Sequence, residues 1–330
     1  FKVLGGSFAM AKYIAKEMGK DVSEMTYDYL TSKKFRDDFG QATFFTATDG
    51  NHGRGVAWAA NKLGQKAVVH MPKGSTQTRF DNIAKEGASV TIEELNYDDC
   101  VRLAAKEAAE TPHGVIVQDT AWDGYEEIPS WIMQGYGSMA GEAAEQLREV
   151  EVNRPTHVFV QAGVGSLAGG VVGYFANLYP NNPPKFIVME AGAADCLYKG
   201  AESFSWQNRL VGGDLQTIMA GLACGEPNTI GWDILRNHVS AFISCPDWVS
   251  AKGMRMLAAP VKGDPSVTSG ESGAVGMGVI SSIMTDDAYK ELREALELDN
   301  SSQVLMFSTE GDTDPDKYKK IVWGGEYPTV

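Results

Sequence analysis

The chain has 330 residues, of which 43% are hydrophobic, and a formal net charge of -14 at pH 7. This length exceeds a typical single domain of ~100–200 residues, so we expect two domains. The negative charge argues against nucleic-acid partners, because phosphate binding needs clustered Lys and Arg. No apolar run approaches the ~18–20 residues that cross a bilayer, and Phe1–Leu4 has no signal-peptide pattern, which favours a cytoplasmic protein.

The first residues of the chain and its four cysteines lead to two further expectations. The chain begins with Phe rather than Met and a motif follows at once, so we expect an upstream segment of the first domain to be absent. The four cysteines are too few and too scattered for a disulfide scaffold, and none lies in a C-x-x-C zinc pattern. Buried free thiols are one interpretation, and a pair between Cys196 and Cys224 is the other.

Short apolar runs alternate with helical patterns along the chain. In chain order we predict strand Thr43–Ala47, helix Gly55–Leu63, strand Lys66–Met71, helix Thr76–Lys85, strand Ser89–Glu93, helix Asp98–Ala109, strand Gly114–Gln118, helix Ile128–Arg148, strand His157–Gln161, helix Ala168–Leu178, strand Lys185–Glu190, strand Ala241–Ser244, helix Ala251–Ala259, helix Gly273–Met284, helix Asp287–Leu296 and strand Val304–Phe307.

This alternation predicts an α/β protein with open, mostly parallel sheets covered on both faces. We expect a small domain at residues 39–130 and a large one at residues 1–38 and 131–330. In open α/β sheets, ligands bind beyond the carboxyl ends of the strands, so the functional motifs are sought there.

The turn Thr48–Gly53 follows the first predicted strand and begins a helix. Unsatisfied N–H groups at a helix start attract anions, so the acid at Asp49 is unusual in this position. Asp49 is either an N-cap or a catalytic carboxylate, and this segment alone favours neither.

A second glycine-rich segment, Gln161–Gly170, also follows a strand and begins a helix. Its backbone donors are suited to a phosphate. Gly163, Gly165 and Ala168 also fit the dinucleotide fingerprint, and the next strand ends at Glu190, near the spacing of a ribose-binding acid. A nicotinamide dehydrogenase is therefore an alternative.

Lys2 stands just ahead of the glycine pair Gly5-Gly6 and a helix. A lysine among apolar and backbone groups loses solvation, which lowers its pKa and makes it a nucleophile able to form a Schiff base. Most lysines are simply solvated, so Lys2 needs support from elsewhere in the chain.

That support comes from the combination of F-K-x-x-G-G, [ST]-x-G-N-H and a glycine-rich phosphate loop. Together they resemble the fold-type-II, tryptophan-synthase-like pyridoxal-phosphate enzymes. Further segments resemble the members of this family that act on 2,3-diaminopropionate: Val117–Tyr125, Trp131–Tyr136, Met219–Asn228, Ser269–Gly276 and Ser308–Asp314.

The resemblance implies a cofactor, pyridoxal 5'-phosphate, in the cleft between two domains. Lys2 would be the Schiff-base lysine, and Asn51 would bind the 3'-oxygen of the cofactor. Ser308, chosen over Thr309, would face the pyridine nitrogen. The cofactor phosphate would be held by Ala162, Gly163, Val164 and Gly165.

The resemblance also implies α,β-elimination of 2,3-diaminopropionate to pyruvate and two ammonia, by a homodimer. Lys2 would take the α-proton of the L isomer and Asp49 that of the D isomer. Asp119 would bind the β-amino group or transfer a proton to it, and Thr48 would contact the substrate. Because an amino group leaves poorly unless it is protonated, the site needs a general acid as well as a base.

Several alternatives remain open at this level. The chain could be a serine or threonine dehydratase, or an amino-acid sensor that keeps the fold without turnover. We expect His52 to be structural. Arg54 meets either the phosphate, the substrate carboxylate or a salt-bridge partner, and Glu271, expected in a loop beneath the cofactor ring, has no assigned role.

Overall fold

The computed structural model describes residues 1–48, 50–203 and 210–329. Its internal contacts divide the chain into two compact units, residues Phe1–Ser138 with Asn228–Ile230 and residues Met139–Pro227 with Gly231–Val330. Residues 39–130, the expected small domain, lie within the first unit. The assignment of residues 1–38 to the larger domain stays a prediction.

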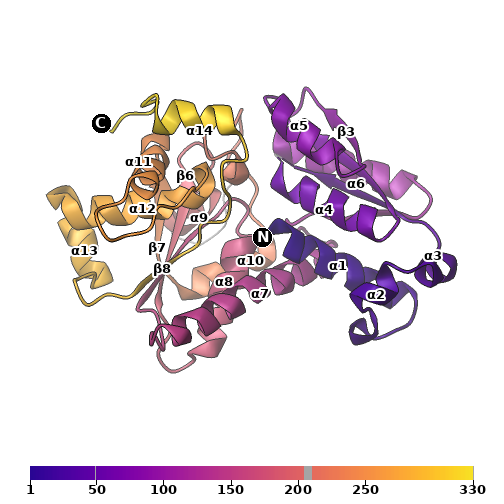
Figure 1. The fold of residues 1–330 in the computed structure, drawn as a ribbon, viewed down its shortest axis with the longest axis horizontal. Helices are drawn as coiled ribbons and strands as arrows, with labels where there is room; N and C mark the ends of the chain where they lie inside the picture. Colours follow the sequence, from indigo (N-terminus) through magenta and orange to yellow (C-terminus); the bar gives the residue numbers. More distant parts are fainter. Residues whose placement is uncertain (49, 204–209, 330) are drawn as a thin grey trace. The chain divides into compact units, whose positions relative to one another are not determined.

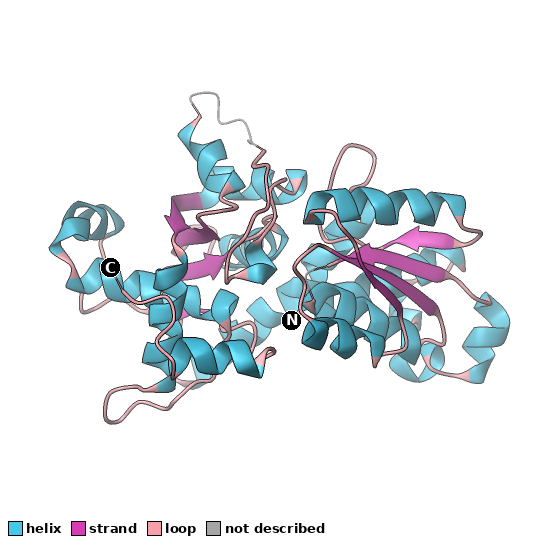
Figure 2. Ribbon diagram, turned by 90° about the horizontal axis from the view of Figure 1, so that it is seen from above, coloured by secondary structure: helices cyan, strands magenta, loops and turns pink. Residues whose placement is uncertain are grey.

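The first unit contains a four-stranded parallel sheet in the order β3-β2-β1-β4. Its strands are β1 (Thr43–Ala47), β2 (Lys66–Met71), β3 (Ser89–Ile92) and β4 (Gly114–Ile116). Helices α4 and α6 pack on this sheet, and Figure 2 shows helices on both of its faces. The central strand β1 is almost entirely buried, as its continuous apolar run predicts.

The described first half of the chain contains seven α-helices. They are α1 (Lys2–Glu17), α2 (Tyr27–Leu30), α3 (Lys33–Phe39), α4 (Asn51–Lys62), α5 (Gln77–Ala84), α6 (Tyr97–Glu110) and α7 (Glu127–Glu149), with a short 3₁₀ turn at Val22–Glu24. The side chains of Ser32, Thr76 and Asn96 accept N–H groups in the first turns of α3, α5 and α6.

The second unit contains another four-stranded parallel sheet, in the order β7-β6-β5-β8. Its strands are β5 (His157–Gln161), β6 (Lys185–Ala191), β7 (Val239–Cys245) and β8 (Val304–Met306). The remaining helices are α8 (Ser166–Leu178), α9 (Cys196–Glu202), α10 (Thr229–His238), α11 (Asp247–Ala258), α12 (Glu271–Thr285), α13 (Lys290–Leu296) and α14 (Pro315–Val322), with 3₁₀ turns at Ala220–Leu222 and Asp287–Tyr289.

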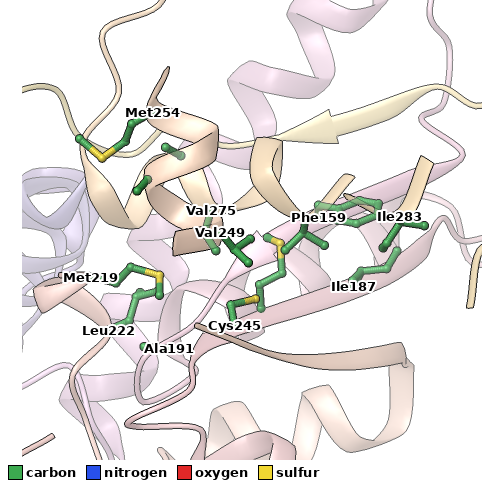
Figure 3. Close-up of a cluster of buried hydrophobic side chains, with 14 of the residues drawn as sticks. Phe159, Ile187, Ala191, Met219, Leu222, Cys245, Val249, Met254, Val275 and Ile283 are labelled. Atoms are coloured by element: carbon green, nitrogen blue, oxygen red, sulfur yellow. The ribbon is translucent and has the colours of Figure 1, made fainter. Parts of the chain in front are cut away.

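The core of the second unit lies between its sheet and helices α11 and α12. Phe159, Ile187 and Val275 are fully buried in this cluster, which Figure 3 shows in close-up. Helices α11 and α12 lie side by side in Figure 1. A Cβ added at Gly253 would lie 2.0 Å from the carbonyl oxygen of Ala274, so the two backbones can approach only because this position is glycine.

All eight predicted strands and all eight predicted helical segments are confirmed, with ends that differ by a few residues. One expectation is wrong: the glycine pair Gly5-Gly6 lies inside α1, because the helix already begins at Lys2. Five helices had no sequence prediction, namely α2, α3, α9, α10 and α14. In the described part of the chain, no helix combines the length and the apolar composition of a membrane span.

Candidate active site

The centre of the site in the first unit is an ion pair between Lys2 and Asp119. Lys2 opens α1, and Asp119 follows strand β4 by three residues. The ammonium group donates a short hydrogen bond to Asp119 Oδ2, and only 19% of the Lys2 side chain and 3% of the Asp119 side chain are exposed. The expected apolar surroundings of Lys2 therefore include a carboxylate.

Aromatic rings complete the surroundings of the Lys2 ammonium. The ring centroid of Phe1 lies 5.2 Å from Nζ and that of Tyr136 lies 5.8 Å away. Such rings attract a cation through their electron-rich faces. Lys2 is thus held by one carboxylate and two rings.

Three polar groups surround Asp119. The hydroxyl of Tyr136 donates to Oδ2 at 3.3 Å, and Nδ1 of His52 lies 4.0 Å from the same oxygen. The side-chain amide of Asn228 donates to the backbone carbonyl of Asp119 at 3.3 Å. Burial opposes ionisation of Asp119, but the charge of Lys2 and the hydrogen bonds outweigh it and hold the pKa of this carboxyl well below its usual range.

His52 is buried in the first turn of α4. Its Nε2 lies 2.9 Å from the carbonyl oxygen of Val117, which only accepts, so Nε2 carries the proton. Burial is the main cause that lowers the pKa of His52, and Asp119 only partly opposes it. His52 is therefore neutral, and its structural role stays a prediction.

The turn before α4 is shaped by Thr48. Its Oγ1 accepts the N–H groups of Gly50 at 2.9 Å and Gly53 at 3.0 Å, so Thr48 caps the helix start. Asn51 is the first helical residue. Asp49, the candidate base for the D isomer, lies outside the described residues, and its cap or catalytic role stays a prediction.

The glycine-rich loop of the second unit connects β5 to α8. Gly165 adopts a left-handed conformation with φ 97° directly before α8, and it has no side chain that could cover the helix start. A Cβ at Gly163 would lie 3.3 Å from both Cys224 Sγ and Leu222 Cα. The loop thus presents backbone at the N-terminus of a 13-residue helix, which suits a phosphate.

The dinucleotide interpretation of this loop is not supported by Glu190. This residue is fully buried, and its two carboxylate oxygens accept the backbone N–H groups of Leu197 at 2.9 Å and Tyr198 at 2.7 Å. A ribose-binding acid must instead present its oxygens to a ligand. Glu190 holds the start of α9.

The hydroxyls of Ser308 and Thr309, which follow β8, have different hydrogen-bond partners. Gln161 Nε2 donates to Thr309 Oγ1 at 2.8 Å, so Thr309 ties the loop to β5. Ser308 is exposed and its hydroxyl donates to Ser269 Oγ at 2.9 Å. Ser308 is the more exposed of the two hydroxyls, and its choice over Thr309 stays a prediction.

The structure also places Glu271, Arg54 and the four cysteines. Glu271 is the first residue of α12 rather than part of a loop, because the helix starts directly after Gly270, and Lys317 Nζ lies 3.6 Å from its carboxylate. Arg54 Nε donates to Glu86 at 3.2 Å, which matches the salt-bridge alternative. The four cysteines, all buried, are free thiols.

Sequence reasoning missed two residues that contact Asp119. Tyr136 and Asn228 both lie in segments that carried the family resemblance, but neither received a role. The available signal was a tyrosine four residues after Ile132 on a helix, which places a polar hydroxyl on an apolar, buried stripe.

These groups fit pyridoxal phosphate. A lysine amine held by a carboxylate can join an aldehyde, the glycine loop at a helix start can hold a phosphate, and an exposed serine hydroxyl can meet a ring nitrogen. An acidic residue in the first turn of α8 would repel such a phosphate, and this turn contains none.

Comparison with known proteins agrees with this donor set. The family model described as pyridoxal-phosphate dependent enzyme matches residues 1–310. A diaminopropionate ammonia-lyase of Salmonella typhimurium is 53% identical over 326 residues, which cover 98% of this chain and 80% of that protein.

Solved structures of the Escherichia coli diaminopropionate ammonia-lyase are similar throughout. The complex with D-serine has a TM-score of 0.92 and 47% identity, covering 100% of this chain and 81% of that one. The complex with an aminoacrylate-PLP azomethine reaction intermediate has a TM-score of 0.87 and 48% identity, covering 99% and 80%.

Proposed function

The chain belongs to the pyridoxal-phosphate-dependent enzymes and, among them, to the diaminopropionate ammonia-lyases, and we propose that it converts 2,3-diaminopropionate and water to pyruvate and two ammonia. The observation that carries this proposal is the buried pair of Lys2 and Asp119. A hydroxy amino acid carries an uncharged hydroxyl on its β-carbon, whereas a diamino acid brings a second cation that a carboxylate can bind.

The residues expected from the sequence would hold the cofactor. Lys2 would bind its aldehyde carbon and Asn51 its 3'-oxygen. The backbone of Gly163, Val164 and Gly165, with Ala162, would hold its phosphate, and Ser308 would meet its pyridine nitrogen. When bound, the cofactor supplies a carbon that takes up the substrate amino group and a ring that withdraws electrons from the α-carbon.

Lys2 supplies the base for the L isomer. Its amine takes the α-proton when it is unprotonated, and the electrons of the broken Cα–H bond form the Cα–Cβ double bond as the Cβ–N bond breaks. Asp119 acts on the other end of the substrate. Its carboxylate, which is ionised beside the Lys2 ammonium, would bind the β-ammonium group in the same way, and this protonated group leaves as neutral ammonia.

Asp49 supplies the base for the D isomer. In the sequence it stands two residues before Asn51 and adds a carboxylate to the segment that follows β1. We expect Asp49→Asn to reduce pyruvate release from D-2,3-diaminopropionate by about 10²–10⁴-fold and to affect the L isomer less, since general base catalysis is worth that much. Equal rates for both isomers in the variant would remove Asp49 from this role.

A substrate comparison tests the proposed reaction. The purified protein with pyridoxal phosphate should show a visible absorbance band that borohydride abolishes. It should release pyruvate faster from 2,3-diaminopropionate than from serine, and faster than it releases ketobutyrate from threonine. Faster release from a hydroxy amino acid would favour a dehydratase, and the band without turnover would favour an amino-acid sensor.

The proposal also covers the oligomeric state of the protein and its location in the cell. We expect a homodimer in the cytoplasm, as is usual for fold-type-II enzymes, with an amino acid as the only small-molecule partner besides the cofactor. Light scattering on the purified protein should give twice the mass of one chain. A monomer with full activity would contradict the dimer.

A further inference from the structure

Tyr136 is a buried polar residue to which the proposed reaction assigns no role. It lies on α7, its side chain is fully buried, and its hydroxyl donates to Asp119 Oδ2 at 3.3 Å. This is the oxygen that also accepts from Lys2. Two donors on one carboxylate oxygen share its negative charge, so each weakens the hold of the oxygen on the other.

The chain makes room for this tyrosine at the start of α1. A Cβ added at Gly5 would lie 2.5 Å from Cε1 of Tyr136, and the ring of Phe1 packs edge-on against the Tyr136 ring with centroids 5.2 Å apart. The glycine that follows Lys2 by three residues therefore admits the ring to the lysine. This is a physical reason for a glycine in the F-K-x-x-G-G motif.

The chemistry of the two donors differs. The ammonium of Lys2 must give up a proton before its amine can react, whereas burial keeps the phenol of Tyr136 protonated because it raises the pKa of that hydroxyl. Tyr136 thus remains a hydrogen-bond donor to Asp119 throughout, and Lys2 does not.

On the basis of the proposed function, we infer that Tyr136 is a positioning residue that holds the Asp119 carboxylate and controls how readily Lys2 releases its proton. With the hydroxyl present, Asp119 Oδ2 binds the Lys2 ammonium less strongly and keeps its place when the lysine is neutral. Without it, more of the negative charge of Oδ2 acts on Lys2, and the amine is harder to generate.

The test compares Tyr136→Phe with wild type in two measurements. The first follows the uptake of pyridoxal phosphate by cofactor-free protein, through the visible band, as a function of pH. The midpoint should move up by about one pH unit, because a hydrogen bond to a charged group is worth roughly tenfold or more in an equilibrium. The second is the pH profile of kcat/KM with 2,3-diaminopropionate. The pH at which kcat/KM rises because Lys2 loses its proton should also move up.

Tyr125→Phe is the matched control. Tyr125 is half-buried in the same unit, and its hydroxyl accepts from Gln118 N at 2.8 Å and donates to the carbonyl of Ile116 at 2.9 Å. Its removal deletes a phenol hydroxyl with backbone partners and should leave both pH midpoints unchanged. Equal midpoints in wild type and Tyr136→Phe, or equal shifts in both variants, would overturn the inference.

A second variant keeps the inference testable if Tyr136→Phe does not fold. Replacement of Tyr136 by 3-fluorotyrosine preserves the ring and makes the hydroxyl a stronger donor, so the uptake midpoint should move down, opposite to the Phe variant. An unchanged midpoint would contradict the inference. Shifted midpoints without turnover of 2,3-diaminopropionate would instead refute only the proposed substrate.

Discussion

Asp119 is both buried and negatively charged. These two properties determine whether it binds a cation or donates a proton. Burial alone would favour the protonated carboxyl, but the adjacent Lys2 ammonium keeps its pKa well below the usual range. A carboxylate of this kind binds a cation and does not donate a proton. Binding of the β-ammonium is therefore favoured over the alternative in which Asp119 delivers a proton to it.

Replacing Asp119 with Asn should remove this interaction while preserving shape. We expect kcat/KM for L-2,3-diaminopropionate to fall by about 10–100-fold, since a hydrogen bond between charged groups contributes about 1.5–3 kcal/mol. Asp123→Asn is the control, because Asp123 is exposed in the same loop. Steady-state pyruvate release measures both variants, and an Asp119→Asn rate within twofold of wild type would show that the carboxylate is dispensable.

Ser308 and Thr309 give a second comparison between neighbouring residues. Ser308→Ala should shift the wavelength of the visible band and weaken cofactor affinity by about fivefold, since an ordinary hydrogen bond contributes about 1 kcal/mol. Thr309→Val should leave the wavelength unchanged, because the Thr309 hydroxyl is bound by Gln161. Absorbance titration with pyridoxal phosphate measures both, and a shift in Thr309→Val alone would reverse the assignment.

The sequence could predict candidate residues better than their contacts. Lys2 and Asp119 were proposed from separate motifs 117 positions apart, and the structure joins them in an ion pair. The hydrogen bond from Tyr136 could not be foreseen, because it depends on the packing of α7 against α1 and not on spacing along the chain. Asp49 remains a prediction from the sequence alone.

At the scale of elements, helices α1 and α7 of the first unit pack through glycines. A Cβ at Gly5 would lie 2.8 Å from the carbonyl oxygen of Ile132, and one at Gly135 would lie 2.6 Å from that of Leu4. Backbone oxygens cannot move aside as a flexible side chain can. This contact fixes the position of Tyr136 relative to Lys2.

The glycine pair offers a matched test of that contact. Gly5→Ala should lower the free energy of unfolding by about 2 kcal/mol through overpacking, and should reduce activity as Tyr136 is displaced. Gly6→Ala should be neutral or slightly stabilising, because its Cβ would lie 3.6 Å from Val56 and alanine favours the helix. Urea unfolding measures both, and equal effects would contradict the proposed packing.

Elements with a clear period were predictable, and those without one were not. The central strands β1, β5 and β6 are almost entirely buried and read as continuous apolar runs, and β3, which is mostly exposed, was found from its β-branched residues. Helices α2 (four residues) and α9 (seven residues) are too short to show a period of 3.6, and α9 is held by the buried Glu190. Tertiary contacts therefore define the elements that the sequence pattern did not reveal.

At the scale of the whole molecule, stability should depend on pH through Glu190. Burial raises its pKa to about 8. The stability that depends on the neutral carboxyl is therefore fully present below the ordinary pKa of about 4.3 and is lost as the pH rises through about 8. Glu190→Gln should flatten the decline of Tm between pH 5 and pH 9, and an unchanged decline would exclude this group as its source.

The ratio of the two products tests the central claim most directly. Holoenzyme supplied with L-2,3-diaminopropionate should release two ammonia per pyruvate, and Lys2→Ala should release neither product at a measurable rate. Lys12→Ala, which alters α1 almost three turns further along the helix, should keep the ratio and most of the rate. A ratio of one, or undiminished turnover in Lys2→Ala, would contradict elimination by the Lys2 and Asp119 pair.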